Sequence, residues 1–215
     1  MIKYELRRLA TNLPLIIGLL LITAFNVLDL RGVIPESAPA DEAFAYFASR
    51  VDYSMPYAAA AMAVALGREF GSRGVSTLVM CGHGRGSIYT LKLGAVAIAV
   101  ILAALLTPTV LLISGMLKLP SGAVLWRFIA MQSSLAAALS ALTVLGCVLV
   151  RDALRSVVIP AVALVTWERL VLSVSGGMAQ FVMESFRVGV VLCDLSVACA
   201  IALVGYLVFR RAALK

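Results

Sequence analysis

A polar segment, REFGSRGVSTLVMCGHGRGSIYTLK, occupies residues 68–92 of a chain that is otherwise strongly apolar. It carries four Lys or Arg residues and a single acid. Three of its apolar residues follow the i, i+3, i+4 spacing of one helix face, namely Val75, Leu78 and Val79. Ser72 can cap the start of such a helix, and Gly82 stands where a helix commonly ends. The sequence therefore predicts a short amphipathic helix in a polar loop, where it can contact a soluble partner.

The composition around this loop is that of a membrane protein. Hydrophobic residues make up 62% of the 215 residues, charged residues make up 13%, and the mean hydropathy is +1.04. Soluble domains contain about 25% charged residues. The net charge of +7 is compatible with nucleic-acid binding, but the basic residues flank apolar runs, as orientation signals do. We therefore expect an all-helical membrane protein with one transmembrane domain over residues 1–215.

Six apolar runs are candidates for membrane spans, each of which needs about 20 residues. The expected spans are 13–30, 53–67, 87–117, 128–150, 156–184 and 188–209. The second span is short and should extend into Glu69 and Phe70. Ser87 is expected to cap the third span, and Pro108 is expected to kink it. The fifth has an apolar run of only 12 residues before Glu168, so its outer end should break into re-entrant or interfacial pieces.

The segments outside these spans are expected to be polar or interfacial. Residues 1–12 combine three basic side chains with an apolar face, which suits an amphipathic helix lying on the anionic cytoplasmic leaflet. Residues 38–40 (APA) look like a signal-peptide cleavage site, but the preceding apolar run is too long, so we expect an uncleaved anchor. Polar loops are expected over 31–52 and 118–127.

The distribution of charge predicts the orientation of the six spans. With both termini inside, the inner segments hold 12 of the 18 Lys and Arg residues and 3 of the 11 acids. The inner side then carries a net charge of +9 and the outer side a net charge of −2. Because inner loops of membrane proteins are enriched in Lys and Arg, both termini are expected in the cytoplasm.

The polar segment also resembles a known family. The pattern Glu69-Phe70-x-x-Arg73, followed by Gly82-x-x-Arg85-x-x-Ile88-Tyr89-x-x-Lys92, resembles the first cytoplasmic loop of type-2 ATP-binding-cassette (ABC) transporter permeases. It looks closest to the small permeases of the bacteriocin-immunity and antimicrobial-peptide export group. The match covers 25 residues without a gap, and the number of spans and the layout of the chain ends also agree. The Gly-rich run over 82–86 is looser than the turn usual in that family.

The resemblance implies a permease subunit of an exporter in the bacterial plasma membrane, with residues 1–12 as an elbow helix and 68–92 as the coupling loop. ATP and Mg would bind to a separate ATPase subunit, present in two copies, and a second permease subunit would complete a homo- or heterodimer. The cargo would be a peptide or a hydrophobic compound. The residues that would couple this chain to the ATPase are Glu69, Phe70, Arg73, Val75, Leu78, Val79, Gly82, Arg85 and Tyr89.

The sequence offers no catalytic constellation of its own. It lacks the GxxxxGK[ST] phosphate-binding motif, and the glycines over 82–86 follow no strand. The single histidine, His83, lies in the polar loop, whereas an intramembrane Ser–His pair needs a histidine inside the bundle. The acids are scattered and the four cysteines lack metal-type spacing, so the cysteines are expected to be small buried residues. We expect no enzymatic activity, metal or cofactor in this chain alone.

Three charged residues of the loop have two interpretations each. Glu69 either fixes the coupling helix against neighbouring basic groups or forms an ordinary interfacial pair with Arg68 or Arg73. Arg73 and Arg85 contact either the ATPase or anionic lipid. Lys92 is expected to be an anchor whose side chain snorkels to the membrane face.

Asp194 is the clearest charge inside a predicted span. A carboxylate in lipid is costly and usually faces protein or water. Asp194 either lies on the export path, where it would help cationic substrates pass, or forms a structural pair with Arg187 or a neighbouring span.

A different class of function remains open. Substrate-binding membrane subunits of vitamin or metal importers also have about six spans and about 200 residues. They require a convergent polar pocket near the outer face, and the sequence shows no sign of such a pocket. Tight binding of a small ligand by the lone chain would favour this alternative.

Overall fold

The computed structural model describes residues 7, 11–30, 38–49, 53–71, 79, 82, 84–152, 155–158, 160, 162 and 188–212. Over these residues the chain forms six α-helices and one short 3-10 helix, with no strand, which confirms the predicted all-helical class. The elements are α2 (Leu13–Leu30), α3 (Ala40–Ser49), α4 (Ser54–Gly71), α6 (Arg85–Ile113), α7 (Gly122–Val150), η1 (Arg155–Val157) and α10 (Val188–Ala212). Three of the described helices, α2, α6 and α7, are long and apolar enough to cross a membrane. The count of six spans stays a prediction.

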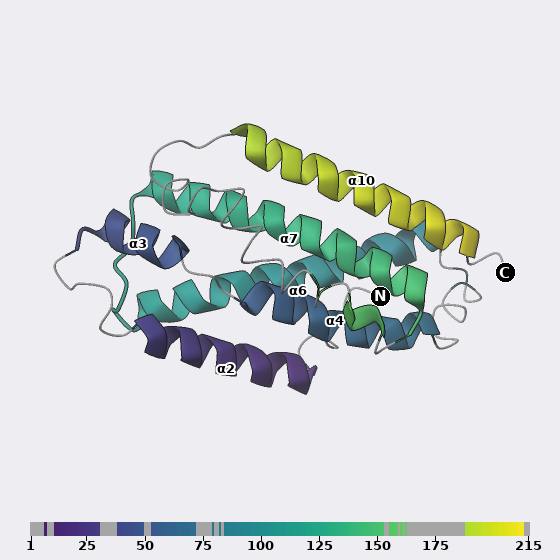
Figure 1. The fold of residues 1–215 in the computed structure, drawn as a ribbon, viewed down its shortest axis with the longest axis horizontal. Helices are drawn as coiled ribbons and strands as arrows, with labels where there is room; N and C mark the ends of the chain where they lie inside the picture. Colours follow the sequence, from purple (N-terminus) through teal and green to yellow (C-terminus); the bar gives the residue numbers. More distant parts are fainter. Residues whose placement is uncertain are drawn as a thin grey trace.

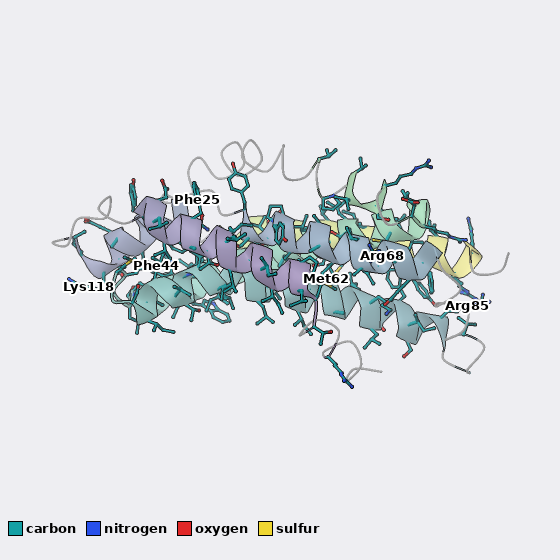
Figure 2. The ribbon with its side chains drawn as sticks, turned by 90° about the horizontal axis from the view of Figure 1, so that it is seen from below. Phe25, Phe44, Met62, Arg68, Arg85 and Lys118 are labelled. Atoms are coloured by element: carbon teal, nitrogen blue, oxygen red, sulfur yellow. The ribbon has the colours of Figure 1, made fainter. Side chains whose placement is uncertain are left out.

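The long helices lie side by side along one axis of the molecule (Figure 1). The end of α4, the start of α6 and the ends of α7 and α10 meet at one end, which we call the basic end. Its described arginines include Arg68, Arg85, Arg151, Arg210 and Arg211. Asp41, Glu42 and Lys118 lie at the opposite end, and Figure 2 shows Lys118 far from Arg68 and Arg85. The predicted orientation requires the more basic end to face the cytoplasm and the end with more acids to face outward, and the described residues divide in this way.

The N-terminal boundary of α2 agrees with the sequence because a local cap defines it. The Asn12 Oδ1 atom accepts a hydrogen bond from the Leu15 backbone N–H at 3.3 Å, which satisfies one of the free donors of the first turn. The helix then runs over Leu13–Leu30, the same bounds as the first predicted span.

The boundaries of α6 differ from those predicted. The helix begins at Arg85 after the N-cap residue Gly84, which makes no side-chain capping bond, so the predicted cap at Ser87 is wrong. It ends at Ile113 instead of residue 117. Gly115 adopts a φ of 73°, and its N–H bonds to the Leu112 carbonyl at 3.2 Å. This left-handed turn stops the helix where glycine permits it.

The start of α7 and the presence of α3 were also missed. Residues 122–127 were predicted as loop but belong to α7, and the predicted loop 31–52 contains α3. The Asp41 carboxylate of α3 accepts a hydrogen bond from the Ser121 N–H at 2.6 Å, next to the first turn of α7. The Phe44 ring packs edge-on against Phe47 and Phe128, with centroids 5.8 and 5.1 Å apart. These tertiary contacts stabilise both elements. The local signal for α3 was its two first-turn acids and the spacing of Phe44, Phe47 and Ala48 on one helix face.

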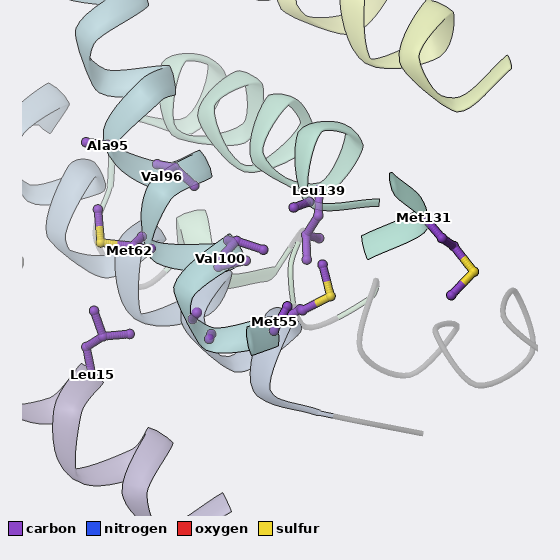
Figure 3. Packing of buried hydrophobic residues seen from close by; sticks show 14 of the residues in the cluster. Leu15, Met55, Met62, Ala95, Val96, Val100, Met131 and Leu139 are labelled. Carbon is purple, nitrogen blue, oxygen red and sulfur yellow. The ribbon is translucent and has the colours of Figure 1, made fainter. Parts of the chain in front are cut away.

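The core forms where α4 crosses α6 and α7. Three alanines of α4, Ala58, Ala59 and Ala63, are fully buried, and their small size lets neighbouring helices approach closely. Figure 3 shows Met62 of α4 with Val96 of α6 in this packing. The helix continues to Gly71, so the predicted extension of the second apolar segment beyond residue 67 is confirmed.

In contrast, α2 is a peripheral helix held to the bundle at a few points. Its buried residues are Leu15, Thr23 and Leu30, and most of its other large side chains are exposed. The Tyr57 hydroxyl of α4 donates to the Pro14 carbonyl at 2.6 Å, and the Asn26 amide of α2 donates to the Thr107 hydroxyl of α6 at 3.3 Å. Gly18 lies so close to Tyr57 that a Cβ atom there would come within 2.0 Å of the ring.

Gly18→Ala should therefore loosen α2 from α4. The new methyl group would displace the Tyr57 ring and break its bond to Pro14, at an expected cost of about 1–3 kcal/mol. Heat-induced loss of monodisperse protein in detergent measures the effect. Gly94→Ala is the matched control, because a Cβ at Gly94 meets no atom within 4 Å. Equal stability of the two variants would contradict the close approach of α2 and α4.

Several predictions fall outside the described residues. They include the elbow helix except for residues 7, 11 and 12, the loop helix over 72–78, and nearly all of the fifth span over 156–184. The described helices α7 and α10 run in the same direction, with Val150 at the basic end and Val188 at the opposite end. A fifth span between them requires this arrangement of its flanking helices.

Candidate functional site

The candidate site is the region where the polar loop leaves α4 and enters α6. We call the helix ends that flank it, residues 68–71 and 84–92, the loop roots. Of the residues predicted to couple this chain to an ATPase, the structure describes Glu69, Phe70, Val79, Gly82, Arg85 and Tyr89. The others, Arg73, Val75 and Leu78, lie outside the described residues.

An ion pair joins the two loop roots. The Lys92 Nζ atom of α6 lies 2.5 Å from the Glu69 Oε2 atom of α4. The Lys92 side chain is only 1% exposed and that of Glu69 is 24% exposed, so the prediction of Lys92 as a snorkelling anchor is wrong. Because a buried ammonium group is costly unless it is paired, the two residues hold the helix ends at a defined spacing. Glu69 thus fixes the loop roots through a basic partner 23 residues further along the chain.

Aromatic side chains extend this connection to α10. The Phe70 ring of α4 packs edge-on against Phe209 of α10, with centroids 5.8 Å apart. The Tyr89 ring of α6 lies 5.8 Å from Tyr206 and 5.9 Å from Phe209, both on α10. Offset and edge-on ring pairs are worth about 0.5–1.5 kcal/mol each beyond the area that they bury. The basic end therefore has an aromatic cluster of Phe70, Tyr89, Tyr206 and Phe209.

Tyr89 is directed inward by a hydrogen bond. Its hydroxyl donates to the Ala202 carbonyl of α10 at 2.9 Å, and the residue is only 2% exposed. Phe70 is half-buried against the core. These two motif residues therefore contact other helices of the same chain.

Arg85, Val79 and Gly82 lie nearer to the surface. Arg85 is half-buried, and its Nη1 atom donates to the Arg210 carbonyl at 3.4 Å, in the last turn of α10, where a cation interacts favourably with the helix dipole. The Gly82 N–H bonds to the Val79 carbonyl at 3.1 Å, and Gly82 has a φ of 83°. Glycine adopts this left-handed conformation readily, and the helix that was predicted to end at Gly82 lies mostly outside the described residues.

A second connection at the basic end involves the turn after α7. A Cβ atom on Gly71 would lie 2.4 Å from the Arg151 carbonyl oxygen, so the end of α4 touches the backbone of that turn. Arg151 itself has a φ of 53°, and its N–H bonds to the Cys147 carbonyl at 3.0 Å. Asp152 then accepts a hydrogen bond from the Arg155 N–H at 2.9 Å, which starts η1.

The sequence did not identify Lys92 as a partner of Glu69, or Gly71, Tyr206 and Phe209 as parts of this site. Tyr206 and Phe209 are three residues apart near the end of the last predicted span, and Phe70 and Tyr89 lie at the same predicted membrane face. That coincidence of aromatic residues was the available signal for the cluster. The close approach of Gly71 to Arg151 has no local signal, because the two residues are 80 positions apart.

Asp194 lies where α10 faces α7, away from the loop roots. It is half-buried on α10, and the Ser134 hydroxyl of α7 donates to its Oδ2 atom at 3.5 Å, the long limit of a hydrogen bond. Its predicted partner Arg187 lies outside the described residues. Of the cysteines expected to be buried, Cys147 is buried near the Ala63 carbonyl, whereas Cys199 is exposed on α10.

The geometry thus places an ion pair and an aromatic cluster at the loop roots, where they link α4, α6 and α10. No protein-family model matches this chain, and no significant match was found to a curated protein or to a solved structure.

Proposed function

We propose that this chain is the permease subunit of an ABC exporter in a bacterial plasma membrane, with both termini in the cytoplasm. A separate ATPase subunit would bind ATP and Mg and dock on the polar loop. The cargo would be a peptide or a hydrophobic compound moved out of the cell. Two permease subunits and two ATPases would make up the transporter.

The observation that carries this proposal is the ion pair between Glu69 and Lys92 behind a loop whose sequence resembles a coupling loop. A loop that receives force from a partner must be anchored to rigid elements, since otherwise the push only bends the loop. Here Glu69 and Lys92, which lie at the two ends of the motif and 23 positions apart, are joined by an ion pair. If the basic end is cytoplasmic, as the charge distribution predicts, a partner ATPase would reach the segment between these two roots.

The mechanism follows from this arrangement. Closure of the ATPase pair on ATP would push the loop, and the joined loop roots would pass the displacement to α4 and α6 as a unit. Packed helix interfaces switch between discrete arrangements, so a small push can open a path between two permease subunits. Asp194 would lie beside such a path as a group that interacts with cationic cargo.

Co-purification from the native membrane tests the proposal. Mild solubilisation followed by mass spectrometry should recover a cassette-type ATPase in stoichiometric amount. Arg73→Glu should lower the recovered ATPase by about fivefold or more, because reversing one interface charge costs at least about 1 kcal/mol. Lys118→Glu, the matched reversal at the opposite end, should leave the recovery unchanged.

Other outcomes would contradict this function. Recovery of the lone chain with a bound small molecule would favour the importer subunit, and recovery of the chain with neither partner nor ligand would count against both transporters. Equal loss of the ATPase from Arg73→Glu and Lys118→Glu would reject the loop as the docking site.

A further inference from the structure

We propose that Tyr89 and Gly205 form a joint through which the polar loop moves α10, so that Tyr89 is a positioning residue that acts through the last helix. This inference rests on the proposed function for the force that drives the movement. The existence of the joint itself rests on the contacts of the described residues.

The joint depends on a close fit between one side chain and one glycine. A Cβ atom on Gly205 would lie 2.4 Å from the Tyr89 hydroxyl oxygen and 3.3 Å from its ring carbon Cζ. Only glycine leaves room for the hydroxyl group to reach the Ala202 carbonyl, one helical turn earlier on α10. A phenylalanine would fill most of the same space without this bond, so burial of the ring alone does not account for the tyrosine.

Neighbouring contacts hold the same two helices together on both sides of the joint. Tyr206 and Phe209 flank the Tyr89 ring, and Arg85 donates to the Arg210 carbonyl. Tyr89 also lies one turn from Lys92, which binds Glu69 across the loop roots. A displacement of the first turns of α6 therefore acts directly on the last three turns of α10.

Movement of α10 would reach the middle of the bundle. Asp194 precedes Ala202 by eight residues, which is about 12 Å along a helix at 1.5 Å per residue. There α10 packs on α7, its main partner among the described helices, and the Ser134 hydroxyl donates to Asp194 at 3.5 Å. Because a continuous helix transmits displacement along its axis, the joint links the loop to the intramembrane carboxylate.

Hydrogen–deuterium exchange on the full chain in lipid nanodiscs tests the joint without a partner. Tyr89→Phe should speed exchange of the α10 amides over 203–209 by about fivefold, the effect of losing one hydrogen bond. Thr90→Val is the matched control, because the Thr90 hydroxyl bonds within α6 to the Gly86 carbonyl. Equal exchange over 203–209 in the two variants would overturn the proposal.

A second variant keeps the test decisive if Tyr89→Phe has a small effect. Gly205→Ala should speed the same exchange by more than fivefold, since its methyl group collides with the Tyr89 hydroxyl. Tyr89→Phe with Gly205→Ala should be less perturbed than the sum of the single variants, because the colliding oxygen is gone. Additive effects would overturn the close fit on which the joint depends.

Hydrogen–deuterium exchange of the complex with the co-purified ATPase measures whether ATP drives movement of α10 through Tyr89. Adding ATP with vanadate should change exchange over both 72–84 and 198–209 in the wild type. In Tyr89→Phe the change should persist over 72–84 and fall by at least half over 198–209. Undiminished change over 198–209 would overturn the role of Tyr89, whereas failure to recover any ATPase would overturn the proposed function and leave the nanodisc result to decide the joint.

Discussion

Glu69→Ala should destabilise this protein by roughly 3–5 kcal/mol, the cost of leaving a buried charge without its ionic partner. The Lys92 side chain is 1% exposed, so its ammonium group cannot regain the lost interaction from water. Lys92→Met should cost less, because Glu69 is 24% exposed and its carboxylate can be solvated. The order of the two effects follows from which charge remains buried.

The double variant Glu69→Gln with Lys92→Met gives the sharpest measurement. Replacing both members of a buried pair by groups of similar shape is often nearly neutral, so the double variant should be more stable than Glu69→Ala. Unfolding midpoints of the detergent-solubilised chain provide the comparison. Arg68→Met controls for loss of a neighbouring exposed charge and should stay within about 0.5 kcal/mol of the wild type. A Glu69→Ala variant as stable as Arg68→Met would show that the pair does not hold the loop roots.

Gly71→Ala should weaken the contact between α4 and the turn after α7. The added Cβ would lie 2.4 Å from the Arg151 carbonyl oxygen, and a backbone atom cannot rotate away as a side chain can. Arg151 is already held in a left-handed conformation at φ 53°, so the turn has little freedom to adjust. The helix end must move instead, and we expect a loss of about 2–3 kcal/mol, within the range for overpacking.

The same substitution should also affect function. A shift of the end of α4 displaces one loop root, so recovery of the ATPase should fall together with stability. Gly122→Ala is the control, because a Cβ at the first residue of α7 meets no atom within 4 Å and alanine favours the helix. Gly71→Ala with the stability of Gly122→Ala would mean that α4 does not approach Arg151 closely.

Local chemistry explains which features of the fold the sequence predicted. The apolar run and the capping side chain of Asn12 define α2. The apolar run over 53–67 is short for a span, which predicted that α4 continues toward Gly71. The helical class and the concentration of arginine at one end also follow from composition and charge order. Each of these depends on residues that are close together in the chain.

The candidate site was predicted in part. The sequence indicated a polar break between α4 and α6, named Glu69 as a residue that pairs with a basic group, and placed a glycine turn at Gly82. It assigned Lys92 to the membrane surface, because a lysine near the end of an apolar run commonly snorkels. Whether such a lysine reaches water or an acid depends on which helix lies beside it, and the sequence of one helix does not contain that information.

The sequence by itself thus determined that this chain is apolar and helical, where most of its polar breaks lie, and how its charges divide between two ends. Only the tertiary structure decided that Lys92 pairs with Glu69, that Tyr89 reaches Ala202 beside Gly205, and that α3 packs on Phe128. The physical reason is the separation in sequence over which each interaction acts. Helix formation and membrane preference act over neighbouring residues, whereas a buried ion pair, a ring contact or a tight glycine contact exists only once distant segments are packed together.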